Sequence, residues 1–356
     1  GAVQRARLRR MPENPAAIRR ADVLWLARLE YRLHAWRERR ARRRGLTPTV
    51  AAFPGYGGAG WVRVLGRVLI TPPARRDAGG EYASVRGWRS FLSVPIGFAQ
   101  VTVRIDGGVH EVVADRGGVV DTVLPADLAP GWHTIAMSVE DGEPVETRVF
   151  VVGDDVRFGI VCDVDDTVMV TALPRPLLAA WNSFVVDEHA RQPVPGMSVL
   201  LERLAREHPG APVVYLSTGA WNIGPTLVRF LSRHLFPAGA VLLTDWGPTH
   251  DRWFRSGTAH KAANLERLAE EFPDVSWLLI GDDGQHDDAV YTAFAGSHPD
   301  SVAAVAIRRL SSAQAVLAGG RTTVNDHSAS AVPWVSGDDG AALLERLEEA
   351  GLTGQD

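Results

Sequence analysis

The chain has 356 residues, 46% of them hydrophobic and 22% charged, a composition typical of a globular protein of about two domains and untypical of a disordered or fibrous one. No apolar run approaches the ~18–20 residues that cross a bilayer, and the single cysteine, Cys162, excludes a disulfide framework and a cysteine-based zinc site. Arginines and Glu30 interrupt every candidate core of a secretory signal, so we expect a cytoplasmic protein.

The charge is distributed unevenly. Residues 1–44 hold 14 arginines against four acidic residues and carry +10; since the whole chain carries −4, the remainder carries −14. The pattern predicts a basic amphipathic helix over 1–46, whose apolar residues recur at helical spacing: Ile18, Trp25, Leu29, Leu33 and Trp36. Two interpretations stay open: either residues 1–44 contact anionic lipid at the inner face of a membrane, or the helix packs on its own protein. No stacking platform accompanies the arginines, so we expect no specific nucleic-acid partner.

In the next part of the chain, apolar residues recur at every second position, which is the period of β-strands. Short runs rich in β-branched residues lie at 61–70, 98–105, 109–114, 119–124, 132–139 and 145–152. Turn residues separate them, as in Asp106-Gly107-Gly108. No helical pattern interrupts these runs, and no catalytic set of residues stands out among them. They predict an accessory all-β sandwich-like domain over 53–153.

From residue 156 strands and helices alternate. Apolar runs at 158–163, 212–217, 240–244, 277–282 and 302–307 are separated by helical patterns near 195–207, 222–235, 259–271 and 285–296. This order predicts an α/β domain over 156–352, built on a doubly wound parallel sheet. Ligands of such sheets bind beyond the carboxyl ends of the strands, so polar residues at those ends are the candidate site.

Aspartates follow two of these strands. Asp163 and Asp165 end the first strand, and Asp282 and Asp287 follow a later one. Carboxylates that converge at one rim repel unless a cation neutralises them, and an all-oxygen ligand set with room for water suits Mg²⁺. The alternatives are a solvated acidic rim or an incidental calcium site.

A hydroxyl and an ammonium accompany the aspartates. Ser217 stands at the tip of the second strand, and Lys261, the single lysine among 38 basic residues, opens the helix before the Asp282 strand. Taken alone, Ser217 is a helix cap and Lys261 a surface charge. Together with carboxylates and Mg²⁺ they predict a pocket for a phosphoryl group, whose charge needs such donors.

In this order the residues resemble the four motifs of the haloacid dehalogenase (HAD) superfamily of phosphotransferases. The matching positions, over roughly 156–310, are Asp163, Asp165 and Thr167, then Ser217, then Lys261, then Gly281, Asp282 and Asp287. The neighbouring residues are similar to the actin-patch-type phosphatidate phosphatase catalytic domain family, which also follows a β-rich region entered through Gly-Tyr-Gly, here Gly55-Tyr56-Gly57. The resemblance implies a HAD-like (Rossmann-like) fold class.

The resemblance also implies roles. The protein would be a Mg²⁺-dependent phosphomonoester hydrolase with phosphatidate as its substrate. Asp163 would form an aspartyl-phosphate, Asp165 would act as general acid and base, Ser217 would bind a phosphoryl oxygen, and Lys261 would neutralise charge. Asp163, Asp282 and the backbone carbonyl of Asp165 would hold Mg²⁺, with Asp287 in support. The expected substrate contacts are Thr167, Thr218, Gly219 and His286; for His286 an orienting or surface role is the alternative.

Two other functions stay open. One is a phosphatase of a soluble or protein-bound phosphate, and the other is a non-enzymatic lipid- or protein-binding module on the same fold. Asp165 argues against the second, because a module that only binds has no need of a general acid. The short spacings between motifs leave little chain for a cap domain, so we expect an open site that suits a bulky or interfacial substrate.

Overall fold

A computed structural model of the chain describes residues 39–40, 43, 45–71, 94–140, 142–170, 192–244, 250–284, 287–317, 327 and 330–353. For 250–256, 313, 316 and 317 it describes the backbone alone. The helix expected over 1–46 therefore lies almost wholly outside the described residues. Within the described part, no helix is both long enough and apolar enough to span a membrane.

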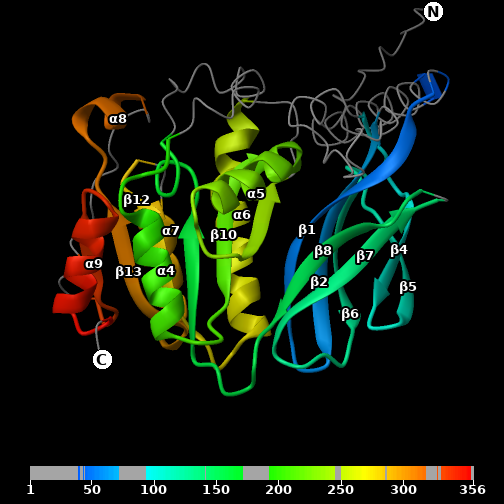
Figure 1. Cartoon of the computed structure of the whole chain (residues 1–356). Helices are drawn as coiled ribbons and strands as arrows, with labels where there is room; N and C mark the ends of the chain where they lie inside the picture. Colours follow the sequence, from blue (N-terminus) through cyan, green and yellow to red (C-terminus); the bar gives the residue numbers. More distant parts are fainter. Residues whose placement is uncertain are drawn as a thin grey trace, which may run out of the picture.

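The first half of the chain forms one β-rich sheet, in the order β3-β2-β1-β8-β7-β4-β5, with β6 paired to β2 (Figure 1). In β4 buried residues alternate with more exposed ones, and Val101 and Val103 are fully buried inside the curled sheet. β2 alternates only at its start, where Val62 and Val64 are buried, and is buried at every position from Val64 to Thr71. The strands are β1 (Thr47–Gly58), β2 (Trp61–Thr71), β3 (Val94–Pro95), β4 (Gln100–Ile105), β5 (Gly108–Val113), β6 (Val119–Pro125), β7 (Gly131–Val139) and β8 (Val145–Val151).

The second half forms a parallel sheet of six strands, in the order β11-β10-β9-β12-β13-β14. Its two central strands are apolar apart from their terminal residues, as expected of strands covered on both faces. The strands are β9 (Phe158–Asp163), β10 (Val213–Ala220), β11 (Ala240–Thr244), β12 (Ser276–Asp282), β13 (Val302–Arg308) and β14 (Trp334–Gly337).

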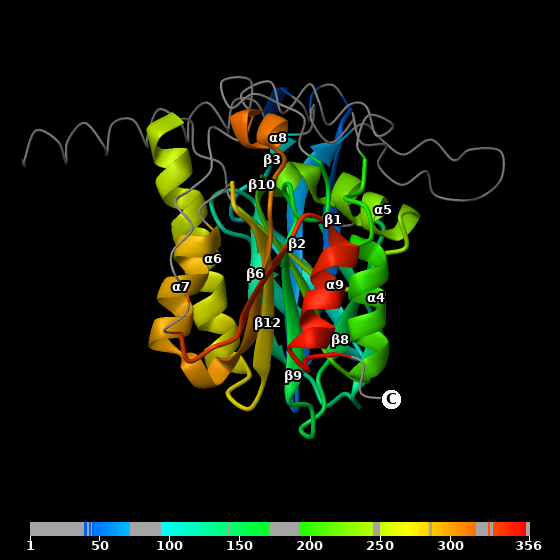
Figure 2. The same ribbon diagram turned by 90° about the vertical axis from the view of Figure 1, so that its left-hand side faces the viewer.

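Helices lie on the two faces of the parallel sheet (Figure 2). On one face α4 packs against α9, and on the other α6 packs against α7. In α4 the buried residues Met197, Leu200, Leu201 and Leu204 recur at helical spacing, which gives the helix one apolar stripe. The helices are α4 (Met197–Glu207), α5 (Gly224–Arg233), α6 (His250–Glu271), α7 (Asp287–Ser297), α8 (Ser312–Leu317) and α9 (Gly340–Glu349), with 3₁₀ turns η2 (Trp221–Ile223) and η3 (Pro299–Ser301).

The predicted fold class is wrong. We expected a HAD-like, doubly wound α/β domain behind a separate all-β sandwich and a basic helix. Instead, more than half of the described strands belong to one mixed, curled sheet, in which β1 pairs with β8 in parallel and the other pairs are antiparallel, and helices are few. The second sheet is parallel, but the chain as a whole does not fit the expected class. Apolar residues at every second position identify a strand but do not show which strand it pairs with, because pairing is decided by contacts between residues that are distant in sequence.

The two halves meet in one buried hydrophobic cluster, and the β-rich sheet has a second hydrophobic cluster of its own. Phe53 and Tyr56 of β1 and Leu65 of β2 belong to the same buried cluster as the strands of the parallel sheet. The ring of Tyr56 lies 5.8 Å from that of Phe272, just beyond the end of α6. The domain boundaries at 53–153 and 156–352 stay a prediction, but the apolar packing continues across them.

Removing one side chain of the cluster that joins the two halves should therefore destabilise the whole protein. Phe53 is 1% exposed, and Phe53→Ala should lower the free energy of unfolding by about 3–5 kcal/mol in urea titrations. Because this cluster is common to both halves, signals from both sheets should be lost in one transition. Val123→Ala, on the exposed side of β6, is the control and should change the free energy by less than about 0.5 kcal/mol. Two separate transitions would contradict a shared cluster.

Candidate functional site

Buried carboxylates end two neighbouring parallel strands. β9 ends at Asp163 and β12 at Asp282, and the strands are paired in register, with Cys162 opposite Ile280. Asp287 begins α7 shortly after β12. One carboxylate oxygen from each of the three aspartates lies within 4.8 Å of the other two, and all three residues are 0% exposed. The structure therefore brings together three of the four predicted metal ligands.

The turn after β12 is shaped around these carboxylates. The backbone N–H of Gly284 donates to Asp282 Oδ1 at 2.6 Å, and that of Asp282 donates to Asp287 Oδ2 at 3.3 Å. A Cβ atom at position 281 would lie 2.6 Å from Asp287 Oδ2, which is too close for any side chain. Gly281 is therefore required by the approach of Asp287 to the strand.

Lys261 is the counter-charge of the cluster. The side chain, on α6, is 2% exposed; its Nζ lies 2.6 Å from Asp163 Oδ1 and also pairs with Asp287 Oδ1. Burial alone would lower the pKa of Lys261, but the negative charges of Asp163, Asp287 and Asp282 outweigh it and raise the pKa above its usual value. The ammonium is thus permanently charged.

One ammonium does not balance three carboxylates. The cluster of Asp163, Asp282, Asp287 and Lys261 carries −2 when all four groups are ionised. Burial, reinforced by Asp287 and opposed by Lys261, raises the pKa of Asp163 well above its usual range. Burial, together with Asp287 and Asp163, does the same to the pKa of Asp282. The arrangement therefore favours a cation bound through oxygen ligands.

Asp165 lies apart from this group of three and contacts the next strand. Ser217, on β10, donates from Oγ to Asp165 Oδ2 at 2.9 Å, and both residues are buried. The same Oγ accepts the backbone N–H of Gly219 at 3.0 Å. The structure therefore joins Asp165 and Ser217, which sequence reasoning placed in one site but did not pair.

The predicted substrate contacts are only partly within the described chain. Thr167 is fully buried beside Asp165, and its Oγ1 has no hydrogen-bond partner among the described residues. Thr218 is half-buried at the end of β10, and Gly219 is buried beside it. His286 lies outside the described residues. Of the predicted substrate contacts that are described, Thr218 and Gly219 therefore follow Ser217 at the end of β10, and Thr167 follows Asp165 in the chain.

Sequence reasoning missed Arg308. This arginine ends β13, is 5% exposed, and stands opposite Asp282 in the pairing of β12 with β13. Its guanidinium donates to the backbone carbonyl of Asp166, a residue with a left-handed φ of 61°, and to Gln314 Oε1 at 3.0 Å. The rule that identified the aspartates, polar residues at the carboxyl ends of parallel strands, applies equally to Arg308.

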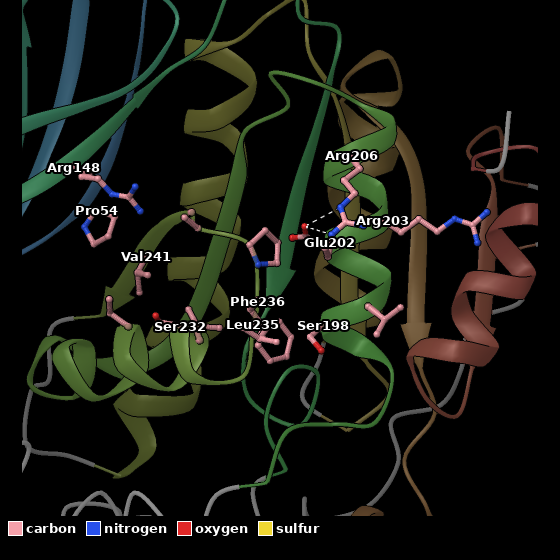
Figure 3. A pocket seen from close by; sticks show the side chains of 16 residues that line it. Pro54, Arg148, Ser198, Glu202, Arg203, Arg206, Ser232, Leu235, Phe236 and Val241 are labelled. Carbon is pink, nitrogen blue, oxygen red and sulfur yellow. Dashed lines mark hydrogen bonds and ion pairs between the residues drawn. The ribbon is translucent and has the colours of Figure 1, made fainter. Parts of the chain in front are cut away.

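A separate cleft of about 920 Å³ opens elsewhere on the molecule (Figure 3). It lies between α4, α5 and the strands β1 and β8, where Pro54, Arg148, Glu202 and Leu235 line it. None of the aspartates described above, nor Lys261 or Ser217, belongs to its lining. The cleft is therefore not the mouth of the carboxylate site.

Fold and site together define a domain in which buried carboxylates at the carboxyl ends of parallel strands meet a lysine of α6. Residues 158–309 match the family described as "Phosphatidate phosphatase APP1, catalytic domain". This part of the chain is APP1-like, which confirms the family resemblance predicted from the motifs.

Two curated relatives match the same part of the chain. Phosphatidate phosphatase APP1 of Saccharomyces cerevisiae is 24% identical over 153 residues, which cover 42% of this chain and 25% of the yeast protein. The uncharacterized protein C29B5.04c of Schizosaccharomyces pombe is 23% identical over 150 residues, which cover 42% of this chain and 24% of that protein. The chain thus spans about a quarter of the length of these relatives.

Solved structures are more remote. XAC1771, a carbohydrate acetylesterase from Xanthomonas citri, is 14% identical with a TM-score of 0.26, covering 71% of this chain and 66% of its own. A carbohydrate esterase with divergent catalytic and non-catalytic binding functions is 10% identical with a TM-score of 0.25, covering 85% and 98%. TM-scores this low do not indicate a common fold.

His260, the neighbour of Lys261 on α6, has an unusual electrostatic environment. Burial, followed by the positive charges of Arg267 and Lys261, lowers its pKa to about 4. In the unfolded chain a histidine titrates near 6.5, so between these values the unfolded state binds a proton that the folded state does not. Stability contributed by neutral His260 is therefore complete above pH 6.5 and is lost as the pH falls toward 4.

His260→Gln should remove this dependence. Between pH 7 and pH 4 the wild-type free energy of unfolding should fall by about 3 kcal/mol more than that of the variant, the equivalent of the pKa difference. Urea titrations at several pH values measure the effect. Curves for His260→Gln that run parallel to those of wild type would show that folding does not lower the pKa of His260.

Proposed function

We propose that this protein hydrolyses phosphate monoesters, with Asp163 as the nucleophile. The observation that carries the proposal is the pairing of buried Asp163 with Lys261, beside an Asp165 that Ser217 orients. A carboxylate, an ammonium and a hydrogen-bonded second carboxylate are the parts needed for two successive displacements at phosphorus. The APP1-like family of residues 158–309 supports the same reaction class.

The cluster also fits Mg²⁺, which we propose as the cofactor. Asp163 Oδ2 and Asp282 Oδ2 are buried without a hydrogen-bond partner in the described part of the chain. A divalent cation would balance the remaining charge of −2, and oxygen ligands suit it. Asp163, Asp282 and Asp287 would hold it, together with the backbone carbonyl of Asp165. When bound, the ion supplies charge neutralisation for the phosphoryl oxygens.

In the proposed reaction Asp163 attacks phosphorus while the bond from phosphorus to the ester oxygen breaks. Asp165 gives its proton to the departing alkoxide, and an aspartyl-phosphate remains on Asp163. A water molecule then attacks phosphorus and gives a proton to Asp165, while the bond from phosphorus to the Asp163 oxygen breaks. Phosphate leaves, and both carboxyl groups are restored. Lys261 neutralises the charge beside Asp163, and the Ser217–Gly219 end of β10 binds a phosphoryl oxygen.

For the substrate we propose phosphatidate, a phosphorylated lipid, which the reaction would convert to diacylglycerol. The support is the similarity to a phosphatidate phosphatase catalytic domain family and to the yeast phosphatidate phosphatase. We also propose that the protein is cytoplasmic and meets the membrane peripherally, with residues 1–44 contacting anionic lipid. Almost all of these residues lie outside the described part of the chain, and the proposal for them rests on their charge of +10.

Phosphate release from a panel of esters tests the proposal. Vesicles containing phosphatidate should release phosphate, and EDTA should abolish the release. Asp163→Asn should eliminate turnover, and Asp165→Asn should slow it by about 10²–10⁴-fold, the usual cost of lost acid–base help. Asp283→Asn is the control; its Oδ1 accepts the N–H of Leu310 at 2.8 Å, an asparagine keeps that bond, and activity should stay within threefold.

Three outcomes separate the alternatives. Release from soluble esters but not from phosphatidate would refute the lipid substrate and leave the phosphatase. Full activity of Asp163→Asn would refute the nucleophile. No release from any ester would refute the reaction itself.

Asp282→Asn tests the ion independently of turnover. Because its carboxyl pKa is raised by burial and by its acidic neighbours, the ionised form destabilises the metal-free protein at neutral pH. The amide should therefore raise the melting temperature in EDTA, while its Oδ1 still accepts the N–H of Gly284. In wild type, Mg²⁺ at about 100 times its Kd should add about 2.7 kcal/mol to the free energy of unfolding, and the variant should lose this gain. An equal gain in both proteins would show that Asp282 is not a ligand.

A further inference from the structure

One side chain of the β-rich sheet reaches the segment that follows Ser217. Arg67, on β2, is 7% exposed and donates from Nη1 to Asn222 Oδ1 at 2.6 Å and from Nε to the carbonyl of Gly117 at 3.2 Å. Asn222 lies in η2, directly after β10. A buried guanidinium needs acceptors, so a hydrogen bond of this kind holds its partner more firmly than an exposed pair would.

Apolar packing reinforces the contact. The ring of Phe53, on β1, lies 5.3 Å from that of Trp221, the first residue of η2. Just beyond η2, a Cβ atom on Gly224 would lie 2.2 Å from Phe53 Cε1, so β1 meets the start of α5 at a position without a side chain. The β-rich sheet therefore holds the segment 221–224 through one polar and two apolar contacts.

The segment 221–224 in turn supports the end of β10, which carries Ser217. A Cβ atom on Gly219 would lie 2.3 Å from Cδ1 of Ile223, so this end of the strand packs directly on η2. The N–H of Gly219 then donates to Ser217 Oγ, which donates to Asp165. The contacts form a continuous path from Arg67 to the proposed general acid.

We propose that Arg67 is a positioning residue for Ser217–Gly219 at the end of β10, acting through Asn222. The assignment rests on the proposed function, which places a phosphoryl oxygen at these residues. Without the guanidinium, residues 217–220 would remain part of β10, but residues 217–222 would no longer be held at a fixed position relative to the phosphoryl group. Small displacements of these residues would weaken phosphate binding strongly. The carboxylates Asp163, Asp282 and Asp287 lie on β9, β12 and α7, so cation binding should not change.

The test uses inorganic phosphate as the probe, in the 356-residue chain with Mg²⁺. Arg67→Met removes the guanidinium and keeps an apolar stem, and Asn222→Ala removes the acceptor. Each should raise the Kd for phosphate and the KM for a soluble phosphomonoester about tenfold, with kcat changed less than threefold. The double variant should be no worse than either single one, because both remove the same contact. Arg67→Lys should restore part of the affinity.

Two controls separate positioning from a general loss of structure. The rise in melting temperature on adding Mg²⁺ should be equal in all variants. Arg104→Met removes an arginine of β4 in the same sheet, whose Nη1 donates to Ser138 Oγ at 3.3 Å, and should leave the phosphate affinity unchanged.

Phosphate affinity within twofold of wild type in both single variants would overturn the assignment, and so would additive losses in the double variant. If Arg67→Met fails to fold, Asn222→Ala leaves the β-rich sheet intact and decides the question by the same measurement. Wild-type protein that neither binds phosphate nor hydrolyses any ester would overturn the proposed function and this assignment with it. Wild-type protein that does both, beside variants that behave identically, would overturn the assignment alone.

Discussion

The site depends on the ammonium of Lys261 among three fully buried carboxylates. Without it, Asp163, Asp282 and Asp287 would place three negative charges in a region closed to water, at a cost that folding could not offset unless protons or cations were taken up. The ammonium is carried by α6, and the far end of α6 is itself fixed, because Glu271 accepts a hydrogen bond from Tyr56 Oη at 2.6 Å. The charge balance of the site thus depends on a contact with the β-rich sheet.

The β-rich sheet is accordingly part of the site's framework. Beside Tyr56, Arg63 of β2 donates to Glu271 at 3.1 Å, and Arg267 of α6 donates back to Asp121 of β6 at 2.8 Å. These partly buried pairs share partners, and a network of this kind fixes geometry better than isolated surface pairs do. Contacts of β1, β2 and β6 therefore hold α6, which bears Lys261. Contacts of β1 and β2 with η2 also support the end of β10, which bears Ser217. The accessory role predicted for this region is thus a supporting one, in which the β-rich sheet holds elements of the site in position.

The site was more predictable from the sequence than the fold. Asp163, Asp282 and Asp287 follow from a local rule, since parallel strands bring their carboxyl ends to one edge. Lys261, in the middle of α6, does not follow from this rule, and the order of the motifs identified it. The same rule applied to β13 would have found Arg308. The partnership of β1 with β8 and the single curled sheet could not be predicted, because strand pairing is settled by contacts between distant parts of the chain, and alternation along one strand does not encode its neighbour. The hydrogen bond from Ser217 to Asp165 was missed for a similar reason: sequence places both residues at strand ends but not their rotamers.

The chain uses its two kinds of cation for different tasks. The guanidinium of Arg308 donates hydrogen bonds to the carbonyl of Asp166, to Gln314 and to the carbonyl of Asp338. The guanidinium of Arg67 donates to Asn222 and to the carbonyl of Gly117. A planar guanidinium suits this task, because its several N–H donors can bind acceptors on separate segments of the chain at once. Lys261 instead meets two carboxylates at a single nitrogen, in a space with 2% exposure. A guanidinium there would need acceptors spread over a wider plane than the ends of β9 and α7 provide. In a chain with 37 arginines, the one lysine stands where a compact ammonium fits and a planar guanidinium does not.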